Sequence, residues 1–263
     1  MKLEVTNLSL SLSGTEILDG IHFSAENAMT VILGENGAGK TTLLKTIAGL
    51  YNPDRGGVFL EGRNLEKLTY RQRARLFSYV PQECQAAGHR VLDFVVMGRN
   101  PYLKFWQMPG RREYAAGQTA LRELGIGHLT DRSMDHLSGG ERRLCYLARA
   151  QVQEADWMIL DEPESGLDFG RRHEFFIQLK EYLKKNKKHA IMSVHDPALA
   201  DMYGDGILFM KKGRLISFIH RQEKDYEEQM AESLKQLYGP GAGLIREGKY
   251  RAVIWRGERD ADH

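Results

Sequence analysis

Features that would place a protein in a specialised class are scarce in these 263 residues. The two cysteines, Cys84 and Cys145, are too few for a disulfide framework and have no metal-ligand spacing, which favours a reducing compartment. The net charge is only +2, from 37 basic and 35 acidic residues, so bulk attraction to nucleic acid is not expected. No apolar run reaches the roughly 20 residues of a membrane helix, and "MKLEVTNLSL" lacks the core of a signal peptide. We therefore expect the chain itself to stay out of the bilayer.

What is present is the composition of an ordinary globular protein. Hydrophobic residues make up 42% of the chain and charged residues 27%, enough of each for a real core and a solvated surface. The length fits one large domain or one domain with an appendage, and length alone does not separate the two.

Apolar runs alternate with helical patterns along most of the chain. Strands are predicted over residues 2–10, 17–23, 30–33, 58–60 and 78–80, and buried parallel strands at "WMIL" (157–160) and "AIMSV" (190–194). Helices are predicted over residues 41–50, 69–75 and 170–185. Between residues 91 and 153 only helical patterns occur, over 91–97, 113–124 and 140–153. This rhythm predicts an α/β core with an inserted helical subdomain.

The stretch "GENGAGKTT" follows a predicted buried strand and precedes a predicted helix. It matches the pattern G-x-x-x-x-G-K-[ST] with Gly34, Gly39, Lys40 and Thr41. In such a loop the glycines let backbone N–H groups wrap closely around phosphate oxygens, and the helix dipole favours negative charge. Lys40 would reach the β- and γ-phosphates, and the Thr41 hydroxyl would bind Mg²⁺. The alternative interpretation is a glycine-rich turn with an incidental Lys-Thr pair.

A second motif, the acidic stretch "WMILDEPESGLD", places Asp161 and Glu162 at the end of an apolar strand. Ligand chemistry gathers at the carboxyl ends of parallel strands. Asp161 fits a Mg²⁺-associated carboxylate, and Glu162 is placed to orient or deprotonate an attacking water. A helix N-cap is the alternative, but Pro163 and the following turn delay any helix until about Gly170.

Further along, "LSGGERRLCYLARAQ" begins at Leu137 and resembles a second anion-binding helix start. Its alternative is a capped helix with no ligand. Residues 221–263 contain a helical stretch (223–238), then "GPGAG", then short strand-like runs at 244–246 and 251–255. No chemical motif occurs in this tail.

Taken together, these motifs resemble those of the ATP-binding-cassette ATPases. Lys40's loop, Gln82 in "YVPQE", "LSGGE", "ILDEP", "SGLD" and His195 in "SVHD" occur in the order found in that family. The resemblance covers about residues 1–219 and implies an α/β P-loop NTPase (RecA-like) core with an antiparallel β subdomain and an inserted helical subdomain. The implied domains are residues 1–220, with the helical subdomain at about 84–154, and an α/β appendage over 221–263.

The resemblance also implies roles for particular residues, with ATP and Mg²⁺ as cofactors. The implied catalytic residues are Lys40, Gln82, Glu162 and His195. The implied Mg²⁺ ligands are Thr41, Gln82 and Asp161. The implied nucleotide-binding residues are Gly34, Asn36, Gly37, Ala38, Gly39, Lys40, Thr41, Thr42, Ser138, Gly139, Gly140 and Asp168. Residues 138–140 would bind the ATP of the opposite subunit, so that a complete site needs two chains head to tail, and residues 165–168 would communicate between the two sites.

Within the family, the segment "VLDFVVMGRNPYLKFW" (91–106) is similar to ATPases of siderophore, heme and cobalamin importers. The expected partners are a second copy, membrane permease subunits docking near residues 82–106 and, indirectly, a substrate-binding protein, with no nucleic acid. The expected location is the cytoplasmic face of the membrane. An exporter or lipid-handling ATPase and a non-transport ATP switch remain the alternatives. Contact candidates, each of which could instead be core, are Phe94, Met97, Arg99, Tyr102 and Phe105.

Some positions depart from the family pattern. Leu12 stands where an aromatic residue usually stacks on adenine, a contact worth about 1–3 kcal/mol. Leu144 and Cys145 replace residues that are commonly different, and Cys145 is expected to be buried and inert. Glu141 in place of the commoner Gln is a known variation.

Overall fold

The computed structural model of the protein describes residues 1–83, 88–248 and 250–256 and divides into two compact units. The first unit joins Met1–Lys67 to Ile191–His263, and the second is Leu68–Ala190. Residue Cys84 and the start of the predicted helical subdomain therefore lie outside the part that the structure describes.

The first unit contains most of the strands. Its elements up to the first boundary are β1 (Leu3–Leu12), β2 (Thr15–Ala25), β3 (Met29–Gly34), α1 (Lys40–Ile47), β4 (Arg55–Leu60), β5 (Arg63–Asn64) and the 3₁₀ turn η1 (Leu65–Lys67). After the second boundary come α7 (Pro197–Tyr203), β9 (Gly206–Lys211), β10 (Arg214–His220), α8 (Tyr226–Tyr238), β11 (Ala242–Glu247) and β12 (Tyr250–Trp255).

An antiparallel sheet in the order β2-β1-β4-β5 forms from the early strands. Val5 of β1 pairs with Phe23 of β2 on one side and with Val58 of β4 on the other. All three side chains are buried, because alternation along each strand directs them to the same face. This sheet is the predicted antiparallel subdomain.

Strand β3, with the sequence "MTVILG", is buried along its whole length. It pairs in parallel with β9, whose "GILFM" is also buried, and β10 returns antiparallel beside β9. Continuous apolar runs of this kind suit strands that are covered on both faces. β3 therefore holds the loop that follows it on a rigid support.

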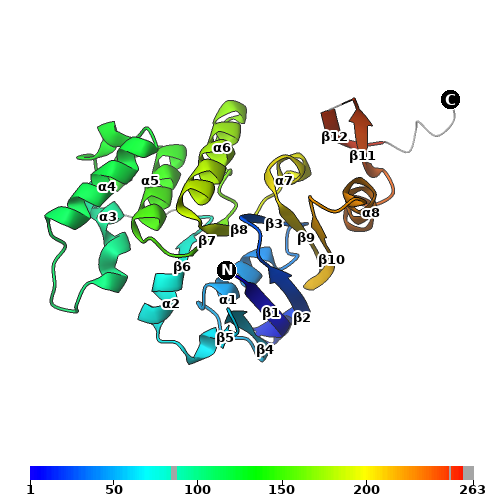
Figure 1. The fold of residues 1–263 in the computed structure, drawn as a ribbon, viewed down its shortest axis with the longest axis horizontal. Helices are drawn as coiled ribbons and strands as arrows, with labels where there is room; N and C mark the ends of the chain where they lie inside the picture. Colours follow the sequence, from blue (N-terminus) through cyan, green and yellow to red (C-terminus); the bar gives the residue numbers. More distant parts are fainter. Residues whose placement is uncertain (84–87, 249, 257–263) are drawn as a thin grey trace. The chain divides into compact units, whose positions relative to one another are not determined.

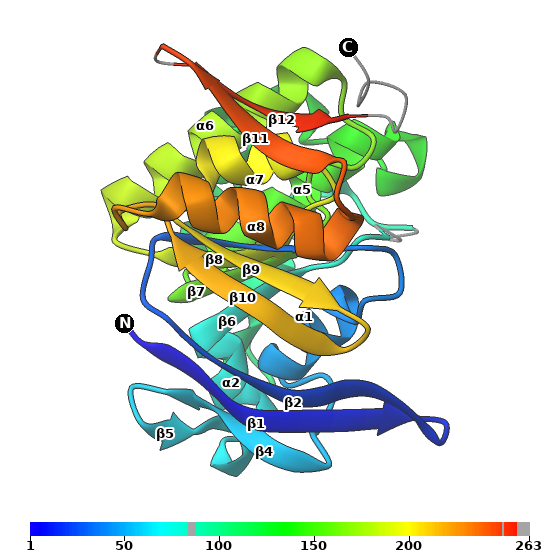
Figure 2. The same cartoon turned by 90° about the vertical axis from the view of Figure 1, so that its right-hand side faces the viewer.

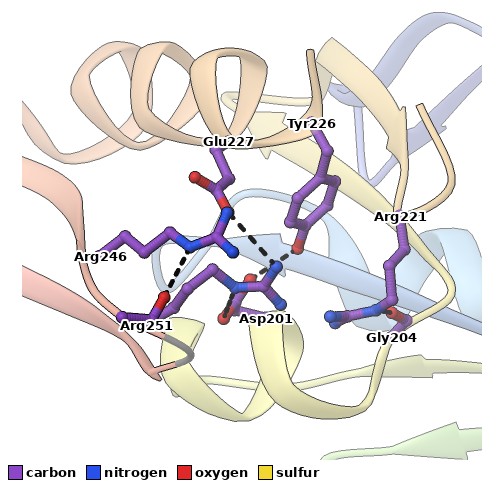
Figure 3. A network of polar contacts seen from close by, with 8 residues as sticks. Asp201, Gly204, Arg221, Tyr226, Glu227, Arg246 and Arg251 are labelled. Atoms are coloured by element: carbon purple, nitrogen blue, oxygen red, sulfur yellow. Dashed lines mark hydrogen bonds and ion pairs between the residues drawn. The ribbon is translucent and has the colours of Figure 1, made fainter. Parts of the chain in front are cut away.

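The tail packs onto this part of the first unit. Helix α8 contacts β9 and β10, and β11 and β12 form a hairpin beside α8 (Figure 2). A polar network fastens the hairpin to α7: Tyr226 Oη donates to Asp201 Oδ1 at 2.8 Å, and Arg251 Nε donates to Asp201 Oδ2 at 3.2 Å (Figure 3). Arg246 Nη1 also lies 2.9 Å from Glu227 Oε1 at the start of α8.

The second unit is mainly helical. Its elements are α2 (Tyr70–Leu76), β6 (Phe77–Val80), α3 (Val91–Val96), η2 (Met97–Tyr102), α4 (Arg111–Glu123), η3 (Gly127–Leu129), η4 (Met134–His136), α5 (Gly139–Val152), β7 (Trp157–Asp161) and α6 (Phe169–Asn186). Strand β8 (His189–Ser193) begins in this unit and ends in the first. Helices α3, α4 and α5 pack against one another (Figure 1), and Gly98 lets η2 approach α5 so closely that a Cβ there would lie 2.3 Å from the Arg149 carbonyl oxygen.

The predicted α/β class, the antiparallel sheet and the helical block are confirmed. Helix α6 starts at Phe169, close to the expected Gly170, and ends at Asn186; the C-cap residue Lys187 has a left-handed φ of 53° within "KKNKK". Strands β9 and β10 and helix α7 have no counterpart among the predicted elements, and the apolar run "GILFM" was the signal for β9. No helix in the ranges that the structure describes has both the length and the apolar character needed to cross a membrane.

Candidate active site

The phosphate loop, residues 34–42, runs from the end of β3 into the first turn of α1. A Cβ on Gly34 would lie 2.6 Å from the Met210 carbonyl oxygen, so this position has no room for a side chain. Gly39 has a φ of +97°, a conformation that favours glycine, and a Cβ there would lie 3.1 Å from the Ile17 carbonyl oxygen. The two glycines let the backbone pass this close to its neighbours, and within the loop the Ala38 backbone N–H donates to the Glu35 carbonyl oxygen at 3.1 Å.

Lys40 folds back over this loop. Its side chain is buried, and Nζ donates to the carbonyl oxygens of Gly34 at 2.7 Å and Glu35 at 3.1 Å. The ammonium group and the N-terminus of α1 therefore offer positive charge to the same loop. Asn36 and Gly37 are exposed, whereas Thr41 and Thr42 are half-buried in the first turn of the helix. This arrangement fits a triphosphate.

Gln82 and Glu162 meet just beyond the ends of two neighbouring strands of the second unit. β6 and β7 are parallel, and Val80 pairs with Leu160. Gln82 and Glu162 each lie two residues after this pair in the sequence, and Gln82 Nε2 donates to Glu162 Oε2 at 2.5 Å. The strand register thus brings together two of the predicted catalytic side chains.

The two carboxylates after β7 are both shielded from solvent. Asp161 is fully buried, and the Tyr79 hydroxyl lies 3.4 Å from its Oδ2. Glu162 is 6% exposed and has a φ of 48°, an uncommon backbone conformation for a residue with a side chain. Non-glycine residues held in the left-handed region need support from their surroundings and occur often at functional sites.

Ser138 caps the N-terminus of α5. Its hydroxyl accepts from the Glu141 backbone N–H at 3.3 Å, and Glu141 Oε2 accepts from the Ser138 backbone N–H at 2.9 Å, which completes a capping box. Gly139 is exposed, and a Cβ there would contact nothing within 4 Å. The cap is therefore real, and the open Gly139 leaves space for a ligand at the helix start.

Asp168 and His195 occupy less enclosed positions. Asp168 caps α6 by accepting from the Arg171 backbone N–H at 2.9 Å. His195 is exposed and precedes Asp196, which caps α7 by accepting from the Ala198 backbone N–H at 2.8 Å. Their roles toward nucleotide stay predictions.

The segment predicted to dock a permease divides into core and surface. Phe94 is buried against Tyr146, with ring centroids 4.7 Å apart, so it belongs to the core. Arg99 forms an ion pair with Glu154 at 2.8 Å and stacks over Tyr102 at 4.4 Å. Phe105, in contrast, is 99% exposed. Among the contact candidates, Phe105 therefore has the clearest surface position.

Sequence reasoning missed Arg143 and Tyr79. Arg143 on α5 is buried, its Nη2 donates to the Gln82 carbonyl oxygen at 2.7 Å, and its Nη1 donates to the Glu162 carbonyl oxygen. Its signal was the helical spacing of Arg143, Leu147 and Ala150, which predicts that all three lie on one buried face. A charged residue on such a face needs polar partners inside the protein.

These features define a class of protein. A glycine loop between a buried strand and a helix, a lysine folded over that loop, and carboxylates at the end of a second buried strand are typical of a P-loop nucleoside triphosphatase.

Comparison with known proteins places the chain within this class. The family model described as "ABC transporter" matches residues 18–165. An uncharacterized ABC transporter ATP-binding protein of Haemophilus influenzae is 39% identical over 252 residues, which is 94% of this chain and 93% of the relative. A Helicobacter pylori protein (strain 26695) named for iron chelatin transport is 36% identical, covering 82% of this chain and 86% of its own length. A solved structure of a metal-chelate type ABC transporter in an inward-facing conformation shares the fold, with a TM-score of 0.80, 23% identity and coverage of 97% and 96% of the two chains.

The chain belongs to the ABC transporter family and is an ATP-binding, ATP-hydrolysing member of it. Its relatives include ATP-binding proteins named for iron chelatin transport, siderophore transport, hemin import and cobalamin import.

Proposed function

We propose that this chain is the ATPase subunit of an importer for a metal chelate of the iron-siderophore, heme or cobalamin type. Two copies would dimerise head to tail around two ATP molecules, and hydrolysis would reopen the dimer. The observation that carries the catalytic part is the 2.5 Å hydrogen bond between Gln82 and the Glu162 carboxylate at the ends of β6 and β7. The names of the relatives support the cargo class.

The phosphate loop binds the triphosphate in this proposal. Backbone N–H groups along the loop would cradle the phosphate oxygens, and Lys40 would exchange its carbonyl partners for the β- and γ-phosphates. The residues assigned to this contact are Gly34, Asn36, Gly37, Ala38, Gly39, Lys40, Thr41 and Thr42.

The donor set proposed for Mg²⁺ suits that ion. Thr41 offers a hydroxyl, Gln82 an amide oxygen and Asp161 a buried carboxylate, all of them the hard oxygen ligands that Mg²⁺ prefers. Bound Mg²⁺ neutralises phosphate charge as it develops during the reaction.

Hydrolysis needs a water placed in line with the γ-phosphate. Glu162 would accept a hydrogen bond or a proton from that water, and His195 would orient the water and the γ-phosphate. Gln82, which already contacts Glu162, would make the carboxylate's position sensitive to the helical segment at about residues 84–154. General-base assistance of this kind contributes about 10²–10⁴-fold to a rate.

The dimer completes each site. Residues 138–140 would bind the γ-phosphate held by the partner, because the N-terminus of α5 and the open Gly139 suit an anion. Residues 165–168, which end at Asp168, would communicate between the two ATP sites.

The permease would dock near residues 82–106 at the cytoplasmic face of the membrane, with a substrate-binding protein acting indirectly through it. Exposed Phe105 and Trp106, at 99% and 79%, support this surface, since aromatic side chains are enriched at interface cores. The net charge of +2 speaks against nucleic acid as a partner.

Reconstitution in proteoliposomes together with its permease partner tests the proposal. Wild-type protein should drive ATP-dependent uptake of one metal chelate, and Glu162→Gln should bind ATP, accumulate a closed dimer and lose turnover. Lys40→Ala should lose ATP binding or hydrolysis, whereas Lys45→Ala, five residues further along α1, should retain both. Normal turnover by Glu162→Gln, outward movement of cargo, or stimulation by DNA would contradict the assignment.

A further inference from the structure

Arg143 on α5 donates hydrogen bonds to the segments that follow β6 and β7. Its side chain projects from α5, and the residue is 7% exposed. One guanidinium nitrogen, Nη2, donates to the Gln82 carbonyl oxygen at 2.7 Å, and the other, Nη1, donates to the Glu162 carbonyl oxygen. Both acceptors belong to residues that the proposed function places at the reacting phosphate.

The geometry of these contacts suits arginine in particular. A guanidinium group is planar and presents its donors in a fixed fork, so it can hold two separate carbonyl groups at a set spacing. An ammonium group on a flexible chain would not fix that spacing in the same way. Because the group is buried, both contacts are made away from competing water, where hydrogen bonds are stronger.

Glu162 is the residue that most needs such support. Its φ of 48° is a conformation that non-glycine residues keep only when neighbouring groups enforce it. Its carbonyl oxygen accepts from the Ser165 backbone N–H at 3.1 Å as well as from Arg143. Arg143 therefore fixes the peptide group from which the Glu162 carboxylate projects.

The same helix begins at the residues proposed to bind the partner's ATP. Ser138 caps α5, and Arg143 follows five residues later, about 7.5 Å along the helix axis. A shift of the helix start therefore moves the guanidinium group as well, because about one and a half hydrogen-bonded turns join the two.

We propose that Arg143 is a positioning residue that couples the two ATP sites of the dimer. Binding of the partner's ATP at residues 138–140 sets the position of α5, and Arg143 transmits that position to the Gln82 and Glu162 backbones of its own protomer. This inference rests on the proposed function, because it uses the roles assigned there to Ser138, Gln82 and Glu162.

The test compares Arg143→Met, which keeps the aliphatic length without donors, with Arg143→Lys, which keeps the charge without the fork. Arg122→Gln on α4 is the control, since its guanidinium group bonds only to Thr119 among the contacts resolved in the described chain, at 3.2 Å and on the surface. We expect Arg143→Met to lower kcat by about 10- to 100-fold, as small misplacements of reacting groups do. Its affinity for ATP should change less than twofold, because the phosphate loop is untouched. The Hill coefficient for ATP should fall from above 1 to 1, with Arg143→Lys intermediate.

Hydrogen exchange adds a readout that a general loss of folding would not imitate. In Arg143→Met the peptide over residues 162–168 should exchange faster, because the Glu162 carbonyl group that holds the Ser165 N–H is no longer fixed. Exchange in α4 should be unchanged. If Arg143→Met does not fold, Arg143→Lys, which retains a buried cation, carries the comparison alone.

Each result has a separate meaning. Unchanged kcat and Hill coefficient in both variants, or a wild-type coefficient of 1, would overturn the coupling. Equal losses of kcat and ATP affinity, with faster exchange throughout the second unit, would show that Arg143 only stabilises the fold. If Glu162→Gln is inactive while Arg143→Met is normal, this inference alone fails, whereas normal turnover by Glu162→Gln removes the proposed function itself.

Discussion

The Ser138 hydroxyl lies 2.8 Å from Glu141 Oε2, and the Ser138 backbone N–H donates to the same oxygen at 2.9 Å. A carboxylate therefore already occupies the two donors of Ser138 at the start of α5. A phosphate that bonds the Ser138 hydroxyl or N–H has to share these donors with Glu141 or displace it. This arrangement ties the stability of the helix start to the charge on one side chain.

We expect the stability of the start of α5 to depend on pH, because the Glu141 carboxyl group titrates. The hydrogen bonds from the Ser138 backbone N–H and hydroxyl hold the pKa of the Glu141 carboxyl below its usual value. Because the folded-state pKa is lowered, the stabilisation is complete above the unfolded pKa of about 4.3 and is lost as the pH falls through the folded pKa. Glu141→Gln keeps a capping-box side chain that does not titrate.

Urea unfolding of the two proteins measures this effect. At pH 7 the wild type should be more stable than Glu141→Gln by roughly 0.3–1 kcal/mol, the value of a charge near an exposed helix N-terminus. The difference should shrink as the pH is lowered below about 4.3. A difference that stays constant between pH 7 and pH 3 would contradict the assignment of the lowered pKa to this carboxyl group.

Gly139→Ala separates a structural glycine from one that a ligand approaches. A Cβ at Gly139 would have nothing within 4 Å, and alanine is favoured over glycine in a helix by roughly 0.5–1 kcal/mol. The variant should therefore fold at least as well as the wild type. If the partner's phosphate packs against this position, ATP-dependent dimerisation and turnover should nevertheless fall by at least about tenfold, a cost of about 1.4 kcal/mol.

Light scattering in the Glu162→Gln background and steady-state hydrolysis measure these two quantities. Gly125→Ala is the control outside the proposed site: its φ of +71° predicts a loss of stability, but ATP-dependent dimerisation and turnover of the folded protein should stay normal. Normal dimerisation by Gly139→Ala would show that the start of α5 is a capped helix that binds no phosphate.

The motifs name the candidate site residues one by one, but they do not predict the contacts between those residues. The glycine pattern identifies the phosphate loop because the close approach to Met210 admits no other residue at Gly34. The contact between Gln82 and Glu162 depends on the register of β6 against β7, which no local pattern specifies. Arg143 was missed for the same reason: its partners lie 61 and 19 residues away along the chain.

Parts of the tail show the same limit. The helix and both strands of the tail are recognisable from local spacing, but the attachment to α7 through Asp201 joins residues 25 and 50 positions apart. Such contacts arise from packing between elements, and sequence periodicity carries no information on which elements meet.

Asp201 is predicted to be the main attachment point of the tail. It is 7% exposed and accepts from both Tyr226 and Arg251, so Asp201→Asn leaves the Arg251 guanidinium group without its nearest negative partner. Hydrogen bonds to charged groups contribute about 1.5–3 kcal/mol each, and the variant should lose stability on that scale. Asp19→Asn, which breaks a more exposed ion pair with Arg214, should lose at most about 1 kcal/mol.

Urea unfolding of the two variants, followed by limited proteolysis, tests the difference. Asp201→Asn should be cleaved faster near β11 and β12, whereas Asp19→Asn should match the wild type. Equal stability of the two variants would show that the network in Figure 3 does not hold the hairpin.

An exposed aromatic turn is predicted to be the anchor for the permease. Phe105 and Trp106 are 99% and 79% exposed, and the Gln107 backbone N–H donates to the Lys104 carbonyl oxygen at 2.9 Å, which closes a turn that presents both rings. Aromatic anchors at the centre of an interface often contribute 2 kcal/mol or more, so each change to Ser should weaken permease binding by about 30-fold. Ile177→Ser on α6, also a large apolar side chain at 49% exposure, should bind as the wild type does. Binding to the permease in nanodiscs measures these affinities. Unchanged affinity in both aromatic variants would show that the permease docks on another surface.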